Sequence, residues 1–252
     1  MRLTERITAQ GRRLFQWRSY IPLLLLPPLW IALIQMARIE QRWGERVENL
    51  WLAVCVCVSA LGLLLRCLTV GFVPGGTSGR GRAAPAASVL NTLGMYSVVR
   101  NPLYLANGVM WLGVALATTS GWFVAFGVLF YWLYIERVIA AEEAFLSERF
   151  GDEFLRWTTR TPCFIPRLSL WHSPAMTFSL RTVLRRESSG LIAIGIAFPL
   201  IQFISGTLLQ GEPVQRWVVT EWQWVVFLGA TLLVGLVLKL LKKLSWLSVP
   251  GR

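Results

Sequence analysis

The sequence is poor in the residues that most enzyme sites use for acid, base and metal chemistry. It contains one His, His172, and one Asp, Asp152, among 252 residues. This scarcity argues against metal sites built on His, against Ser-His-Asp triads and against Asp-rich magnesium sites that hold diphosphates. Any chemistry must rely on Glu, Arg, Tyr and backbone groups. We expect His172 to be an interfacial loop residue.

Cysteine and glycine motifs are also scarce. The four Cys residues show no CxxC spacing, so disulfides and structural zinc are not expected, and each Cys is interpreted as a small hydrophobe. The Gly-rich stretch 71–82 lacks the Lys-Ser/Thr ending of a P-loop and is predicted to be a flexible cytoplasmic loop. No GxGxxG followed by an acidic residue occurs, which argues against a Rossmann domain.

Apolar residues dominate what is present. The chain is 55% hydrophobic and 15% charged, its mean hydropathy is +0.54, and it has 13 Trp. This composition indicates an integral membrane protein of the all-α class, a polytopic helix bundle. About six transmembrane helices are predicted: Tyr20 to Met36, Leu50 to Val73, two within Leu103 to Ile135 joined by a tight turn, Leu191 to Leu209, and Trp222 to Leu241.

The basic residues predict the orientation of these helices. With a net charge of +12, all but five of the 25 Lys and Arg residues fall in the termini and the even-numbered loops. Four lie in the opposite loops, and Arg66 lies inside the second helix, where we expect it to snorkel. This asymmetry places both termini and the Glu142 loop in the cytoplasm, and favours anionic phospholipid headgroups over nucleic acid as partners. The basic amino terminus is not a secretory signal.

Two adjacent carboxylates, Glu142 and Glu143, have no Lys or Arg three or four positions away. If the fourth helix continues past the membrane surface, Glu142 interrupts an apolar face, where a carboxylate is costly unless it is paired or hydrogen-bonded. Glu143 lies about 100° round the helix, at the edge of the same face. We interpret the pair as a binding site; a solvated helix end is the alternative.

A second polar feature, Arg100-Asn101-Pro102-Leu103-Tyr104, opens the third helix. Asn is a favoured N-cap and Pro a favoured first helical residue, so the pair Asn101-Pro102 has a structural explanation. The same helix start also directs free N–H groups and a positive dipole end at any carboxylate or phosphate placed there.

These motifs resemble the isoprenylcysteine carboxyl methyltransferase and phospholipid methyltransferase superfamily over roughly Gly71 to Arg167. The resemblance rests on residues 91–96, 100–104, Glu142-Glu143, Phe150-Gly151, Phe154 and Ile165-Pro166. It implies that S-adenosylmethionine (SAM) binds between membrane helices, with cofactor contacts from Tyr96, Arg100, Asn101, Pro102, Leu103, Tyr104, Glu142 and Glu143.

Two positions depart from the family pattern. Asn101 replaces the usual His, so proton transfer at that position is in doubt, and Ala106 replaces a Gly, which we expect to narrow the approach of a ligand. Arg137 is a further catalytic candidate, beside Arg100, for holding an anionic acceptor. No metal site is expected.

The predicted function is SAM-dependent methyl transfer to a membrane lipid or lipid-linked substrate at the cytoplasmic face, most naturally of a bacterial inner membrane. O-methylation of a lipid phosphate or a prenylcysteine-type carboxylate is favoured, because these oxygens are ionised and need no general base. The alternatives are phospholipid amine N-methylation, an NADPH-dependent reductase, and a non-catalytic membrane factor or small transporter. The predicted organisation is a two-helix part (1–70), a methyltransferase core (71–167) and a C-terminal part (168–252).

Overall fold

The computed structural model describes residues 3–18, 20–75 and 87–252, and of residues 37–43 and 45 the backbone alone. The described residues form helices joined by turns and loops and contain no strand, which confirms the all-α prediction and the absence of a Rossmann sheet from this part of the chain. Much of the Gly-rich stretch 71–82 lies outside the described residues, so its predicted flexibility is not addressed.

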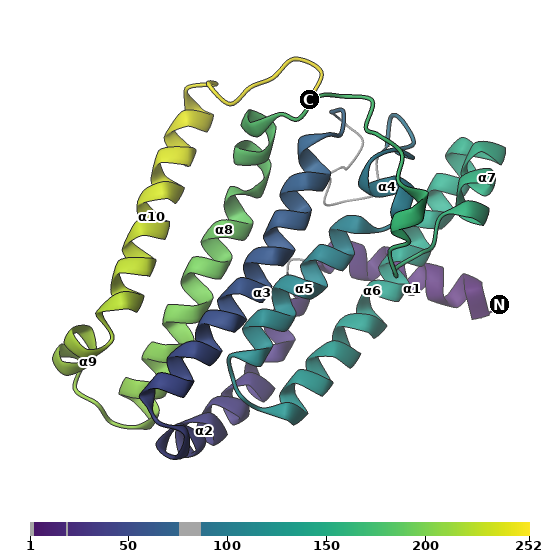
Figure 1. Cartoon of the computed structure of the whole chain (residues 1–252). Coiled ribbons are helices and arrows are strands. Elements are labelled where there is room, and N and C mark those ends of the chain that lie inside the picture. The colour runs from purple at the N-terminus through teal and green to yellow at the C-terminus, as the bar shows by residue number, and fades with distance from the viewer. Residues whose placement is uncertain (1–2, 19, 76–86) are drawn as a thin grey trace.

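Five long helices run side by side in the order α10, α8, α3, α5, α6, each packed against the next (Figure 1). Their bounds are α3 Glu45–Gly71, α5 Pro102–Leu116, α6 Gly121–Phe150, α8 Leu180–Phe203 and α10 Trp222–Lys243. The remaining helices are α1 Leu3–Trp17, η1 Ile21–Leu25, α2 Leu26–Trp43, α4 Met95–Val98, α7 Asp152–Arg160, η2 Leu168–Leu170, the π-helix η3 Ile204–Leu209 and α9 Val214–Thr220.

Four helices of the described residues are long and apolar enough to cross a membrane: Arg46–Gly71, Gly121–Phe150, Leu180–Leu209 and Trp222–Lys243. The segments Leu3–Trp17 and Ile21–Met36, bent by 92°, make a fifth if they count as one broken span. Helix α5 has 15 residues and is therefore about 22 Å long, less than the roughly 30 Å of a bilayer core. The count of six crossings and their orientation stay predictions.

Two helices joined by a tight turn occupy 102–150, as predicted. Residues 117–120 connect α5 to α6, with Thr119 at a positive φ of 52°. Helix α6 continues to Phe150, beyond the predicted apolar limit at Ile135, and buries Tyr131, Ile135, Val138 and Ile139 on one face. This confirms the helical register that places Glu142 on an otherwise apolar face.

Helix α8 begins at Leu180 rather than at the predicted Leu191, because Ser179 caps it by accepting a hydrogen bond from the Thr182 amide (3.3 Å). The start of α8, whose first two turns contain Arg186 and Glu187, lies at the end of the bundle where α5 begins (Figure 1).

Small residues let α3 and α5 approach closely. Ser59 donates a hydrogen bond to the Met110 carbonyl (2.9 Å), and a Cβ added to Gly113 would lie 2.6 Å from the Cys55 carbonyl oxygen. Close backbone approach of this kind is a common way for membrane helices to pack.

Replacing Gly113 by Leu should separate α3 from α5 and lower the thermal midpoint of the detergent-solubilised protein by several degrees, since overpacking costs roughly 1–3 kcal/mol or more. Gly127→Leu is the control, because nothing lies within 4 Å of a Cβ at that helical position. Equal midpoints for the two variants would contradict the close α3–α5 contact.

Candidate functional site

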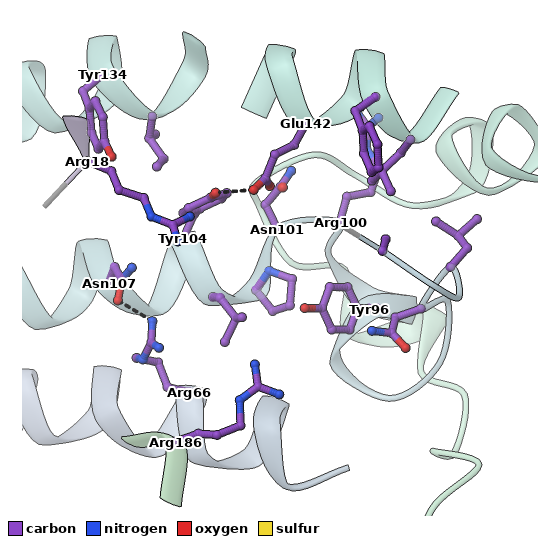
Figure 2. Close-up of a pocket in the computed structure, with 18 of the residues that line it drawn as sticks. Arg18, Arg66, Tyr96, Arg100, Asn101, Tyr104, Asn107, Tyr134, Glu142 and Arg186 are labelled. Carbon is purple, nitrogen blue, oxygen red and sulfur yellow. Dashed lines mark hydrogen bonds between the residues drawn. The ribbon is translucent and has the colours of Figure 1, made fainter. Parts of the chain in front are cut away.

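A cavity of about 350 Å³ lies at the end of the bundle where α5 begins, within the range of roughly 300–1,000 Å³ typical of small-molecule sites. Its walls are formed by residues of α3, α4, α5, α6, α7 and α8, by the segment before α4 and by Arg18, which directly follows α1. Figure 2 shows the labelled polar side chains. The polar lining residues include Arg18, Arg66, Asn91, Tyr96, Arg100, Asn101, Tyr104, Asn107, Tyr134, Glu142, Arg186 and Glu187.

The segment that carries Tyr96 and Arg100 is held by the loop after α7. The amide of Arg100 donates to the Pro162 carbonyl, that of Arg167 to the Val98 carbonyl and that of Gly94 to the His172 carbonyl, each at 2.9 Å. His172 is an exposed loop residue whose backbone contributes to this framework, as its sequence context indicated. Residues 162–172 therefore fix the wall of the cavity formed by 94–100.

Tyr104 and Glu142 meet across the boundary between α5 and α6. The Tyr104 hydroxyl donates to Glu142 Oε1 at 2.8 Å (Figure 2). The Tyr131 hydroxyl donates to the Tyr104 carbonyl at 2.6 Å. Both Tyr104 and Glu142 line the cavity. The structure thus brings together two predicted cofactor residues that are 38 positions apart in the chain.

Glu143 occupies a different place from Glu142. Its Oε1 lies 2.9 Å from Nη1 of Arg100, and Glu143 is not among the residues that line the cavity. Arg100 does line it, and its buried Nε has no hydrogen-bond partner within the described part of the chain. Glu143 therefore positions Arg100, while Glu142 faces the cavity directly.

Helix α5 begins at Pro102 with Asn101 at the N-cap position, as predicted, but the Asn101 side chain does not cap the helix. The Asn101 side chain makes no capping hydrogen bond; its amide instead donates to the Cys163 carbonyl at 3.1 Å, because the loop after α7 lies beside it. The first turn of α5 has no side-chain cap as a result. Leu103 and Tyr104, which carry its first free N–H groups, line the cavity.

Arg66 does not snorkel to the surface, contrary to the sequence interpretation. It makes a two-point ion pair with Glu187 (2.6 and 3.1 Å) and donates to Asn107 Oδ1 at 2.6 Å. The side chains of Arg66 and Glu187 are only 18% and 4% exposed, so both are largely shielded from water. Sequence analysis missed this network; the signal that could have revealed it was a charged residue inside an apolar helix.

Arg18 and Arg186 also line the cavity, and the sequence had indicated only their contribution to topology. Figure 2 shows the Arg18 guanidinium beside Tyr104, on the side of α5 that faces α6, and Arg186 on the opposite side, near Arg66. Cationic side chains therefore face the cavity from both sides of α5.

Comparison with known proteins gives this geometry a family context. Residues 82–153 match the model of the phospholipid methyltransferase family. The matched segment contains Tyr96, the 100–104 motif and both glutamates, and the resemblance inferred from those residues is confirmed. Arg18, Arg66, Arg186 and Glu187 lie outside it.

Two curated relatives share part of this chain. A cobalt-zinc-cadmium resistance protein, CzcN, of Cupriavidus metallidurans is 39% identical over 89 residues, covering 33% of this chain and 38% of its own. A nickel-cobalt-cadmium resistance protein, NccN, of Alcaligenes xylosoxydans xylosoxydans is 42% identical over 84 residues, covering 33% and 39%. The chain thus spans about two fifths of the length of these relatives. No solved structure matches the chain significantly.

Arg137 and Ala106 do not line the cavity. Arg137 donates to Gln10 of α1 (3.0 Å) and to the Leu133 carbonyl (2.6 Å), and it does not line the cavity. Its predicted contact with an acceptor stays untested and is not favoured by this position. Ala106 is fully buried against Gly62 of α3, so the expectation that it narrows the ligand's approach is wrong.

Burial raises the pKa of the Tyr96 phenol, and the nearby charge of Glu142 raises it further, while Arg186 and Arg66 act in the opposite direction. The hydroxyl therefore stays protonated through neutral and mildly alkaline pH and can donate a hydrogen bond. Figure 2 shows it pointing towards the middle of the cavity.

Burial also raises the pKa of the Cys163 thiol, and the carboxylate of Glu143, 3.9 Å away, adds to the effect. Only the thiolate is nucleophilic, and a raised pKa lowers the thiolate fraction near neutral pH. Alkylation of Cys163 by iodoacetamide at about pH 7.5 should therefore be slower than that of an unstructured peptide thiol. Peptide mass spectrometry should show the rate still rising above about pH 9. Glu143→Gln should shift this profile to lower pH; an unchanged profile would contradict the contact.

Proposed function

We propose that this protein is an integral membrane methyltransferase that transfers a methyl group from SAM to a lipid or lipid-linked acceptor. The observation that carries the proposal is the convergence of Tyr96, the start of α5 and Glu142 on one cavity, within the segment that matches the phospholipid methyltransferase family. The apolar helices around this cavity would give a membrane lipid access to it.

The donor groups at the cavity fit the chemistry of SAM. The Glu142 carboxylate can accept hydrogen bonds from ribose hydroxyls or from the α-amino group. The uncapped start of α5 and the Arg100 guanidinium suit the SAM carboxylate, and the faces of Tyr96 and Tyr104 suit a sulfonium cation. SAM brings an already activated methyl group, so the protein needs chiefly to position the reactants and exclude water.

We further propose that the acceptor is an anionic oxygen, a lipid phosphate or a carboxylate, and that the reaction takes place at the cytoplasmic face, most naturally of a bacterial inner membrane. An ionised oxygen requires no base, which agrees with the scarcity of His and Asp. The positive-inside charge pattern supports the cytoplasmic placement, where SAM is available.

Titration of the purified protein in neutral detergent with SAM and, separately, with NADPH tests this proposal against a reductase. Saturable SAM binding together with transfer of label from methyl-labelled SAM to a lipid fraction of membranes supports it. NADPH binding without SAM binding would overturn it in favour of the reductase. If the protein binds neither SAM nor NADPH, the interpretation as a non-catalytic membrane factor is the one that remains.

The names of the two relatives suggest a second, cellular role in resistance to metal ions. We propose that any such role of this chain depends on its methyltransferase site, since the described residues contain no group of three His, Cys, Asp or Glu placed to hold a metal. In a resistance-deficient host, the wild-type protein should restore growth on cobalt or nickel, whereas Glu142→Gln should not. Equal growth of hosts that carry the wild-type protein and hosts that carry Glu142→Gln would show that resistance does not depend on the methyltransferase site.

A further inference from the structure

The cavity has a wall that the family match does not account for. Arg18 directly follows α1, Arg66 comes from α3, and Arg186 and Glu187 come from α8, all outside residues 82–153. We propose that Arg66, Arg186 and Asn107, on the side of α5 opposite Arg18 and Tyr104, form the acceptor subsite and bind the anionic headgroup of a single lipid beside the SAM site, with Glu187 holding Arg66 in place. This inference rests on the proposed function and deepens it.

The charge of the cavity supports an anionic occupant. Among the described lining residues are four guanidinium groups, of Arg18, Arg66, Arg100 and Arg186, and two carboxylates, of Glu142 and Glu187. Glu143 adds one more negative charge just outside, on Arg100. The net charge of these groups is therefore positive even in the absence of SAM. Bound SAM adds the positive charge of its sulfonium. A headgroup that carries an anionic oxygen would offset this charge, whereas an ammonium headgroup would add to it.

The geometry separates two sides of the cavity. Tyr104 and Glu142 lie between α5 and α6, where the SAM contacts are proposed, whereas Arg66 and Asn107 meet between α3 and α5. The ion pair with Glu187 fixes the Arg66 guanidinium, and α8 places Arg186 next to that pair in sequence and beside it in Figure 2. A preorganised guanidinium pair is well suited to a phosphate or carboxylate.

Tyr96 lies between these two sides. Figure 2 shows its hydroxyl pointing into the cavity between Glu142 on one side and Arg186 on the other, and all three residues line the cavity. A headgroup held by Arg186 would therefore present an oxygen near Tyr96, next to the methyl donor held by Glu142.

In the transfer step, a lone pair of the headgroup oxygen forms the new O–C bond while the C–S bond of the sulfonium breaks, and the electron pair of that bond stays on sulfur. The anion loses one negative charge as it becomes a methyl ester, the sulfonium becomes a neutral thioether, and no proton moves. The subsite therefore has to supply cationic contacts rather than a base, which matches its composition of Arg and Asn side chains.

A matched series of single-chain amphiphiles tests the inference. Dodecyl phosphate, dodecanoate and dodecylamine would be titrated into the SAM-loaded protein in a neutral detergent, with calorimetry as the readout. We expect the phosphate or the carboxylate to bind at least roughly tenfold more tightly than the amine, and whichever of the two binds more tightly identifies the headgroup. Preference for the amine would overturn the proposal.

Single substitutions test which side chains bind the anionic headgroup. Arg186→Gln should weaken binding of the preferred anion by roughly tenfold or more, the size expected for a lost charge-assisted hydrogen bond, and leave the Kd for SAM within about threefold. Arg186→Lys should retain part of the affinity. Arg181→Gln is the control, because Arg181 lies on the same helix but is exposed and outside the cavity.

Different results would overturn the acceptor subsite and the methyltransferase function. Normal SAM binding and methyl transfer, combined with anion affinities that are equal in Arg186→Gln, Arg181→Gln and the wild type, would overturn the acceptor subsite alone. Absence of SAM binding in the wild type would overturn the proposed function and the subsite with it. Thermal midpoints close to the wild-type value would show that a weakened variant is folded.

Discussion

Replacing Glu142 by Gln is expected to weaken SAM binding by roughly 100-fold and to abolish detectable methyl transfer. The carboxylate faces the cavity and accepts a hydrogen bond from the Tyr104 hydroxyl. Its charge-assisted hydrogen bonds to a cationic ligand would be worth roughly 1.5–3 kcal/mol each, and the amide loses both the charge and part of the acceptor capacity. Equilibrium dialysis with labelled SAM measures the Kd.

Two neighbours on α6 make this prediction specific. Glu143→Gln should have a smaller effect, because Glu143 contacts Arg100 and lies outside the cavity. Glu148→Gln should have none, since Glu148 is exposed. Equal losses at Glu142 and Glu148 would show that the charge of the helix end, rather than the cavity, governs binding.

Replacing Arg66 by Ala is expected to destabilise the fold by roughly 3–5 kcal/mol, because it leaves the carboxylate of Glu187, only 4% exposed, without its cation. Thermal unfolding in detergent should then begin on the order of 10 °C lower. The ion pair joins α3 to α8 across 121 positions of the chain, and Asn107 ties α5 to the same guanidinium.

The double variant Arg66→Met with Glu187→Met provides the control. Replacing both partners of a buried pair by apolar side chains of similar size is often neutral, so most of the lost thermal stability should return. Binding of an anionic amphiphile should not return, because the subsite no longer has its fixed guanidinium. A double variant as unstable as the single one would show that the pair does not act as a unit.

Much of the helical framework could be predicted from the sequence. The pair α5–α6 follows from one long apolar stretch interrupted by Thr118, Thr119 and Ser120, and the apolar period past Ile135 predicted that α6 would reach Glu142. The start of α8 could not be predicted from hydropathy, because residues 180–190 are rich in Arg and Ser. That segment is nevertheless helical, since Ser179 caps it and Val183 is buried on its inner face.

The candidate site was predictable where local motifs determine it. Tyr96, Tyr104 and Glu142 were expected together and do line one cavity. The ion pairs that depend on tertiary packing could not be predicted. The Glu143–Arg100 pair and the Arg66–Glu187 pair each join segments that are distant in the sequence and meet only in the folded bundle. For the same reason Asn101, a good N-cap by residue type, instead binds the Cys163 carbonyl.

The central claim is that SAM binds in the cavity formed by the start of α5 and the end of α6. Photolabelling of the purified protein with an azido analogue of SAM, followed by peptide mapping, tests it most directly. The account predicts label in residues 87–107 or 131–157, lost on addition of excess SAM and absent in Glu142→Gln. Competable label confined to residues 190–243, in α8 to α10, would contradict it.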